Sequence, residues 1–153
     1  MNVVLSSDRD ITLMKFLWRW KLASTSALHK RFFDSLSPKT AYKRLWKLQR
    51  AGFLKTYSDT DRSMLLWGLD KSGFKRIKED LPTLAQDCYR SEHVVHDFLT
   101  TAFHVGELLT VKSGPIKVFS EQELRSLELH DYPSWVPRSK RHRPDGYWSV
   151  YQN

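Results

Sequence analysis

Residues 37–52 contain both the start signal and the stop signal of one helix. Ser37 offers a hydroxyl N-cap, and Pro38 follows at the first helical position, where its missing N–H costs nothing. Gly52 stands just past the end, at the C′ position that favours glycine. One apolar stripe at helical spacing consists of Ala41, Leu45 and Leu48. The sequence therefore predicts a helix over residues 37–51 that buries this stripe.

Further elements flank this helix on both sides, and turn or cap residues separate them. The expected order is a helix from caps at 6–8 to residue 22, a short helix over 24–33, the helix over 37–51, a strand over 53–57, a polar turn over 58–63, a strand over 64–69 and a helix over 70–80. The apolar side chains expected to face the core are Ile11, Met14, Leu17, Trp18, Leu28, Phe32, Phe33, Phe74 and Ile77. Three helices, a hairpin and a further helix in this order predict a winged helix-turn-helix domain over residues 1–81.

The chain changes character after Leu81-Pro82. We expect a long apolar helix from Ala85 to about Thr110, strands over 116–119 and 147–151, and a segment over 121–129 that is either strand or helix. Breaks are expected at 113–115 and in the aromatic loop 132–137. The fold class is α+β: an N-terminal winged helix-turn-helix followed by a smaller α/β segment, residues 82–153, with a long helix and short strands.

Positive charge is concentrated in the first half of the chain. Residues 1–80 hold 17 Lys and Arg against 8 Asp and Glu, a net charge of +9, whereas residues 81–153 hold 8 against 9, a net charge of −1. Such an asymmetry is typical of a surface that binds a polyanion. A solvated basic surface that aids solubility is the other interpretation.

The helix over 37–51 resembles the recognition helix of winged-helix regulators, whose N-terminal part enters the major groove of double-stranded DNA. By position, the candidate base or near-base contacts are Lys39, Thr40, Tyr42 and Lys43, and the candidate phosphate contacts are Arg44, Lys47 and Arg50. Phosphate contacts are also expected from the preceding helix, at Ser24, Thr25 and Lys30. Arg62 at the tip of the wing could reach a minor groove, although Asp59 and Asp61 beside it would repel phosphate. A solvated basic helix face is the competing hypothesis.

Two motifs in the second half occur together. Ser91-Glu92-His93-Val94-Val95-His96-Asp97 lies in the long helical candidate, and Arg143-Pro144-Asp145-Gly146 precedes the last strand. A winged helix followed by these motifs resembles the replication-relaxation family of plasmid and mobile-element proteins over essentially the whole chain. The resemblance implies a DNA-binding role in plasmid replication, its control or transfer.

The second half also resembles the core of restriction-endonuclease-like nucleases. The resemblance implies a Mg²⁺ site built from Glu92 or Glu107 together with Asp145, since hard cations prefer oxygen ligands. The Glu-x-Lys that completes such sites is missing, because the chain reads GYWSVYQN after Asp145 and stops inside a strand. We therefore expect either a truncated nuclease-like domain or a dimerisation domain, with no catalysis and no cofactor. His93 and His96 could share a metal, but histidines at this spacing more often cap, hydrogen-bond or pack.

The remaining sequence features bear on the cellular location of the protein and on its partners. The single Cys88 excludes an internal disulfide and a cysteine-based zinc finger, and the chain has neither a signal peptide nor an apolar run of about 20 residues. A cytoplasmic protein that does not bind membranes is expected. The long apolar helix is the expected surface for a homodimer or for another mobile-element protein. A winged helix that binds proteins instead of DNA is a third hypothesis. Core packing is expected for Trp18, Trp20, Trp46 and Trp67, and exposure for Trp135.

Overall fold

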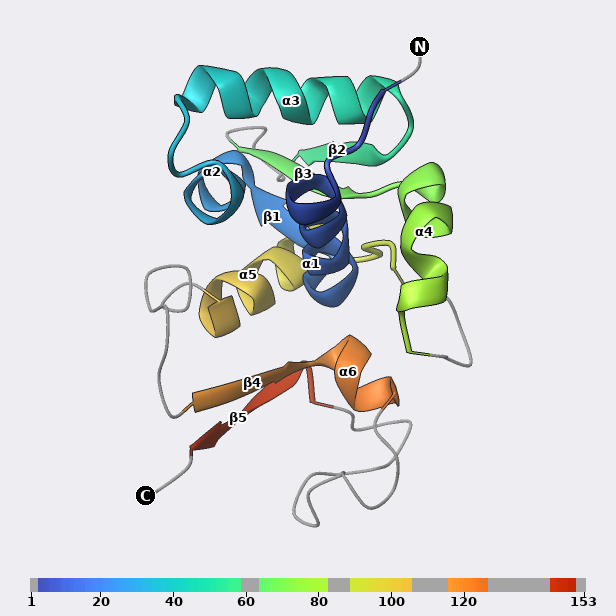
Figure 1. Ribbon diagram of the computed structural model, residues 1–153. Coiled ribbons are helices and arrows are strands. Elements are labelled where there is room, and N and C mark those ends of the chain that lie inside the picture. Colours follow the sequence, from blue (N-terminus) through green and yellow to red (C-terminus); the bar gives the residue numbers. More distant parts are fainter. Residues whose placement is uncertain (1–2, 59–63, 83–88, 106–115, 127–143, 151–153) are drawn as a thin grey trace.

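The computed structural model describes residues 3–58, 64–82, 89–105, 116–126 and 144–150 (Figure 1). The N-terminal elements are a π-helical turn at Ser7–Ile11, α1 (Thr12–Trp20), β1 (Leu22–Ser24), α2 (Thr25–Phe32), α3 (Pro38–Arg50), β2 (Leu54–Ser58), β3 (Leu65–Leu69), α4 (Lys71–Ile77) and a 3₁₀ turn at Lys78–Asp80. The C-terminal elements are α5 (Val94–Val105), β4 (Ile116–Ser120), α6 (Glu121–Ser126) and β5 (Gly146–Val150). No helix in these ranges is long and apolar enough to cross a membrane.

The first half is a winged helix-turn-helix, and the α+β class expected from the sequence is confirmed. Its three strands form an antiparallel sheet in the order β1-β3-β2. Trp67 lies at the centre of the sheet, because it is the register partner of both Ala23 on β1 and Thr56 on β2. The three-residue strand β1 was not expected. It forms because β3 has an edge left open by β2, and the segment between α1 and α2 pairs with that edge.

Local capping chemistry fixes α2 and α3 as the sequence predicts. The Ser24 hydroxyl accepts a hydrogen bond from the Ala27 amide at 3.2 Å, and the Ser37 hydroxyl accepts one from the Thr40 amide at 3.2 Å. Gly52 has φ +77°, and its amide donates to Gln49 while the next amide, of Phe53, donates to Leu48. These two bonds form a Schellman end, which satisfies the last carbonyls of α3.

The expected side-chain caps of the first helix do not form. Ser6 makes no side-chain cap bond, and the chain enters the helix through the π-helical turn. Instead, the carboxylate of Asp10 reaches back and accepts a hydrogen bond from the Ser6 amide at 2.7 Å. An ionised carboxylate is a strong acceptor, so this bond fixes the chain at the entry to the helix.

The main core lies between the helices and the three-stranded sheet. Trp18, Trp20 and Trp67 are buried and Trp46 is partly buried, so the expected packing of these tryptophans is confirmed. The other fully buried apolar side chains include Leu13, Met14, Leu17, Leu28, Leu45, Leu48, Leu54 and Leu69. Ile11, Phe32 and Phe74 are only partly buried at its margin.

The second half differs from the expected long helix. Residues 89–93 are not helical, and α5 begins only at Val94. Tyr89 falls within the expected helix but is not helical. Its ring stacks on that of Phe74, with 4.4 Å between the ring centroids. The segment after β4 is resolved as helix α6, and β4 pairs with β5 in an antiparallel ladder. The expectations at 85–88, 106–115, 127–143 and 151–153, which include Cys88, Glu107 and Trp135, lie outside the described residues.

The two halves share an extensive boundary. In Figure 1, α5 lies below β1 and beside the lower part of α1, and the β4–β5 ladder with α6 lies below these two helices. The Thr101 hydroxyl donates to the Trp20 carbonyl at 2.9 Å, and Arg19 on α1 pairs with Glu123 on α6 at 2.7 Å. The division into two domains at residue 81 stays a prediction, but the described residues on its two sides are held together by polar contacts.

Candidate nucleic-acid interface

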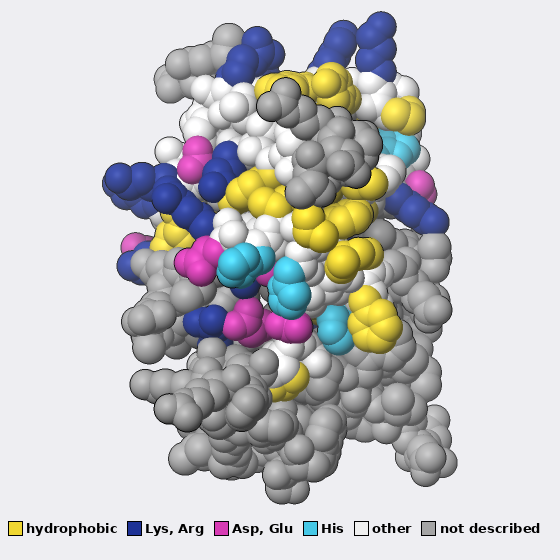
Figure 2. All heavy atoms as spheres, turned by 180° about the vertical axis from the view of Figure 1, so that it is seen from behind, with side chains coloured by type: hydrophobic (Ala, Val, Ile, Leu, Met, Phe, Trp, Pro, Cys, Tyr) yellow, Lys and Arg dark blue, Asp and Glu magenta, His cyan; other side chains and the backbone are white. Residues whose placement is uncertain are grey.

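The helical periodicity that buries the apolar stripe of α3 also places the side chains between those positions on the opposite, outward face. Ala41, Leu45 and Leu48 have no exposed surface, so α3 is fixed on the core with its other side toward solvent. Figure 1 shows α3 at the outer end of the molecule, and Figure 2 shows Lys and Arg side chains standing at that end. The predicted contact residues on this exposed side are Lys39, Thr40, Tyr42, Lys43, Lys47 and Arg50. The structure therefore brings together six of the seven predicted residues of this helix.

The four cations of this face are not neutralised within the described part of the chain. No carboxylate there forms an ion pair with Lys39, Lys43, Lys47 or Arg50, and α3 itself contains no Asp or Glu. They follow one another at spacings of four, four and three residues, which places them along one side of the helix. The row extends over about 16 Å of helix, which is longer than a single small anion.

An aromatic series connects this face to the core. Tyr42 meets Trp46 edge to face at 6.0 Å between ring centroids, and Trp46 meets Trp67 in the same manner at 5.4 Å. Tyr42 is 45% exposed and lines a shallow hollow together with Trp46 and the neighbouring cations. Its phenol therefore lies at the surface, with the ring in contact with Trp46.

Arg44 is placed differently from the other predicted contacts. Its guanidinium donates to the fully buried carboxylate of Asp10 and to the Val4 carbonyl. Only 17% of the Arg44 side chain is exposed. The sequence prediction counted Arg44 among the phosphate contacts from its position along the helix alone. Position along a helix cannot show that a carboxylate from another element lies beside the residue.

The predicted contacts at the start of α2 are also engaged inside the protein. The Thr25 hydroxyl accepts a hydrogen bond from the indole N–H of Trp67 at 2.8 Å, and the Ser24 hydroxyl serves as N-cap and lies 3.0 Å from that of Ser26. Thr40 on α3 is similar, because its hydroxyl lies 2.9 Å from the Ser37 hydroxyl. Lys30 is exposed. Arg62, with Asp59 and Asp61, lies outside the described residues.

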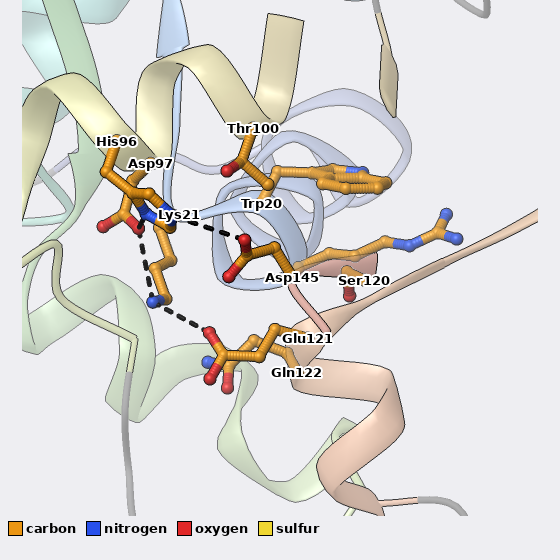
Figure 3. A pocket seen from close by; sticks show the side chains of 10 residues that line it. Trp20, Lys21, His96, Asp97, Thr100, Ser120, Glu121, Gln122 and Asp145 are labelled. Carbon is orange, nitrogen blue, oxygen red and sulfur yellow. Dashed lines mark hydrogen bonds and ion pairs between the residues drawn. The ribbon is translucent and has the colours of Figure 1, made fainter. Parts of the chain in front are cut away.

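A second cluster of charged side chains lies at the boundary of the two halves (Figure 3). The Lys21 ammonium lies 3.5 Å from Asp97 on α5 and 3.1 Å from Glu121 on α6. His96 lies between Asp97 at 3.4 Å and Asp145 at 3.3 Å. Sequence inspection missed Lys21, Asp97 and Glu121, although a lone acid among the apolar positions of a helix, such as Asp97, is a signal for a buried partner.

The electrostatics of this cluster favour ion pairing within the protein. Burial alone would lower the pKa of Lys21, but the carboxylates of Glu121 and Asp97 outweigh it and raise the pKa above its ordinary value. Burial alone would raise the pKa of Glu121, yet Arg125 and Lys21 together hold the pKa below its ordinary value. Both groups are therefore charged at neutral pH.

The same cluster contains Asp145, the candidate metal ligand. Within the described ranges, no group of three or more His, Cys, Asp or Glu side chains is arranged to hold a metal ion. Asp145 faces His96 rather than Glu92, which is exposed together with His93. Lys21, in the same cluster, pairs with the carboxylates of Asp97 and Glu121. Glu107 is outside the described residues.

No protein-family model and no curated protein matches the chain. Among solved structures, an apo double mutant of ZitR from Lactococcus lactis aligns with 70% of this chain and 70% of its own, at 17% identity and a TM-score of 0.40. A single mutant of ZitR in complex with DNA aligns with 70% of this chain and 64% of its own, at 23% identity and a TM-score of 0.40. The winged-helix assignment rests on this chain's own elements and strand order.

Proposed function

We propose that this chain is a DNA-binding protein that inserts α3 into the major groove of double-stranded DNA. The observation that supports this best is the row of Lys39, Lys43, Lys47 and Arg50, which is exposed and has no carboxylate partner among the described residues. A row of cations along a helix neutralises phosphates on the two sides of a groove and releases condensed counterions. The net charge of +9 over residues 1–80 supplies a matching long-range attraction.

The position of each residue on α3 assigns its role. Lys39, Tyr42 and Lys43 lie in the N-terminal half of the helix, which is the part that reaches base edges in helix-turn-helix proteins. Lys47 and Arg50 lie in the last turns and are assigned to phosphates. Arg44 takes a structural role, since its guanidinium is held by Asp10. Thr40 is left with a secondary role because its hydroxyl is engaged at the cap.

The biological setting is a narrower proposal. The resemblance of residues 91–97 and 143–146 to the replication-relaxation family supports a regulator or accessory protein of a plasmid or other mobile element. Control of transcription or of replication would both follow from occupancy of a specific DNA site. No catalytic step is part of this proposal.

A salt-titrated binding assay tests the proposal. Fluorescence anisotropy would compare a duplex from the gene's own upstream region with a scrambled duplex of the same length. We expect Lys43→Gln, at an assigned base contact, to weaken binding to the gene's own duplex and to reduce its preference over the scrambled duplex. Lys75→Gln, an equivalent change at an exposed lysine on α4, is the matched control and should leave both quantities unchanged. Equal behaviour of the two variants, or no binding even at low salt, would overturn the assignment and favour a protein-binding winged helix.

A further inference from the structure

The surface of α5 is more apolar than its contacts with the core require. On a helical wheel, the apolar positions together with Thr101 span about 200°, whereas a helix packed on one side needs an apolar stripe of only about 100°. Phe98, Thr101 and Val105 lie on the inner part of this arc. The outer part is exposed, and its large side chains are Val95 at 44%, Leu99 at 59% and Phe103 at 73% exposure.

A groove borders this exposed face directly. It has a volume of about 260 Å³ and lies between α5 and α2, with the α5 wall formed by Phe98, Thr101, Ala102 and Val105. The opposite wall includes Ala27 and Lys30 of α2. Ala102 belongs to both the groove and the exposed side of the helix. Protruding apolar side chains and an apolar recess therefore occupy one continuous surface, and Figure 2 shows hydrophobic side chains gathered across the middle of this face.

We propose that this surface, defined by Val95, Leu99, Ala102, Phe103 and the adjoining groove, binds a second copy of the same chain. A two-fold contact uses the same patch on both subunits, so it needs a protrusion and a matching recess side by side. The α5 surface has this property: the large side chains of one copy can enter the groove of the other. A partner with a different surface would not require both features in one patch.

The distribution of charge also favours a second copy. The whole chain has a net charge of +8, which opposes self-association at most of its surface. Helix α5 contains no Lys or Arg, and its single acid, Asp97, is buried and paired with Lys21. Two copies can thus approach along α5 without placing like charges in contact. The α5 side of this surface is equally unsuited to nucleic acid, because it offers no cation to a phosphate, and the groove adds only Lys30 on its far wall.

The test is the mass of the full chain in solution without DNA, measured by sedimentation equilibrium over a range of concentrations. We expect the wild type to form a dimer of twice the 18.1 kDa chain mass. Leu99→Lys places a charge at the centre of the contact and should raise the dimer Kd by roughly 100-fold or more, as expected for loss of a central anchor. Leu36→Lys, the same change at another exposed leucine outside this surface, is the control and should leave the Kd unchanged.

Val95→Lys provides a second variant at an exposed position of the same face. Circular dichroism identifies any variant that has failed to fold, so that loss of dimer is counted only for folded protein. A monomeric wild type, or dimerisation of folded Leu99→Lys and Val95→Lys with wild-type affinity, would overturn the proposal. DNA binding through α3 is measured separately with Lys43→Gln, so failure of one proposal leaves the other unaffected.

Discussion

The guanidinium of Arg44 on α3 is paired with the fully buried carboxylate of Asp10, which lies in the π-helical turn before α1. The Arg44 Nε atom is 3.3 Å from Asp10 Oδ1, and a second guanidinium nitrogen contacts the other carboxylate oxygen. The same carboxylate accepts the Ser6 amide, so it joins the N-terminal segment to α3. The helix that carries the candidate DNA contacts is thus positioned by a buried ion pair as well as by its apolar stripe.

Adjacent cations on α3 should therefore respond differently to mutation. Arg44→Ala leaves the Asp10 carboxylate buried without its main partner, which costs about 3–5 kcal/mol of unfolding free energy. Lys43→Ala removes an exposed cation and should change that free energy by less than about 0.5 kcal/mol. Urea denaturation followed by tryptophan fluorescence measures both. Similar unfolding free energies for the two variants would show that the Asp10–Arg44 pair does not hold α3 in place.

Acid should weaken the fold through Asp10. Burial alone would raise its pKa, but hydrogen bonds from Arg44 and the Ser6 amide, with the charges of Arg44 and Arg9, hold the pKa below the ordinary value of 3.8. The stability that results is fully present above pH 3.8 and is lost as the pH falls through the lower pKa of the folded state. We expect the unfolding free energy to decline steadily below that pH.

Asp10→Asn isolates this contribution. The variant should be less stable at neutral pH and should lose less stability on acidification than the wild type. Asp8→Asn changes an exposed acid in the same turn and should retain the wild-type decline. Denaturant titrations at several pH values provide the comparison. An unchanged acid decline in Asp10→Asn would assign the effect to other carboxylates.

The extent to which sequence predicts this molecule follows from the range of the interactions involved. Ser37, Pro38 and Gly52 act on their own neighbours, so both ends of α3 could be predicted. The strand β1 could not, because three residues become a strand only when β3 offers an edge. The roles of Arg44 and Thr25 were missed for the same reason. Their partners, Asp10 and Trp67, lie 34 and 42 residues away, and no local pattern indicates them.

The contact between the two halves should depend on Lys21. Its ammonium joins Asp97 and Glu121, and its side chain is only 18% exposed. Lys21→Met would leave the buried Asp97 carboxylate without its cation, so we expect a loss of about 3 kcal/mol of unfolding free energy. Hydrogen exchange should show the loss as faster exchange in α5 and α6 than in α3.

Lys15 offers a matched control for this change. It pairs with Asp80 at 2.9 Å, but the two side chains are 40% and 54% exposed. Exposed pairs contribute little because water screens them, so Lys15→Met should cost less than about 1 kcal/mol. If Lys15→Met and Lys21→Met lower the unfolding free energy equally, the boundary cluster is not the main connection between the halves.

Gly73 tests whether close packing or helix propensity dominates in α4. In an ordinary helix interior, Gly→Ala stabilises by about 1 kcal/mol, because alanine restricts the unfolded chain and favours the helix. Here a Cβ at residue 73 would lie 2.2 Å from the Phe53 carbonyl oxygen and 2.8 Å from Leu69 Cδ1. The first of these atoms belongs to the backbone at the start of the hairpin, so it cannot rotate away. Gly73→Ala should therefore destabilise the protein by about 1–3 kcal/mol, the usual cost of overpacking.

The neighbouring Ser72→Ala is the control, since Ser72 is exposed on the same helix and the change adds no atoms. It should alter the unfolding free energy by less than about 0.5 kcal/mol. The sign of the change in unfolding free energy for Gly73→Ala decides between the two effects. Helix propensity alone predicts a gain in stability, whereas steric contact predicts a loss. A gain in thermal and urea stability would mean that α4 can move away from Phe53 without cost. A loss would show that the hairpin and α4 are fixed together by the absence of a side chain at residue 73.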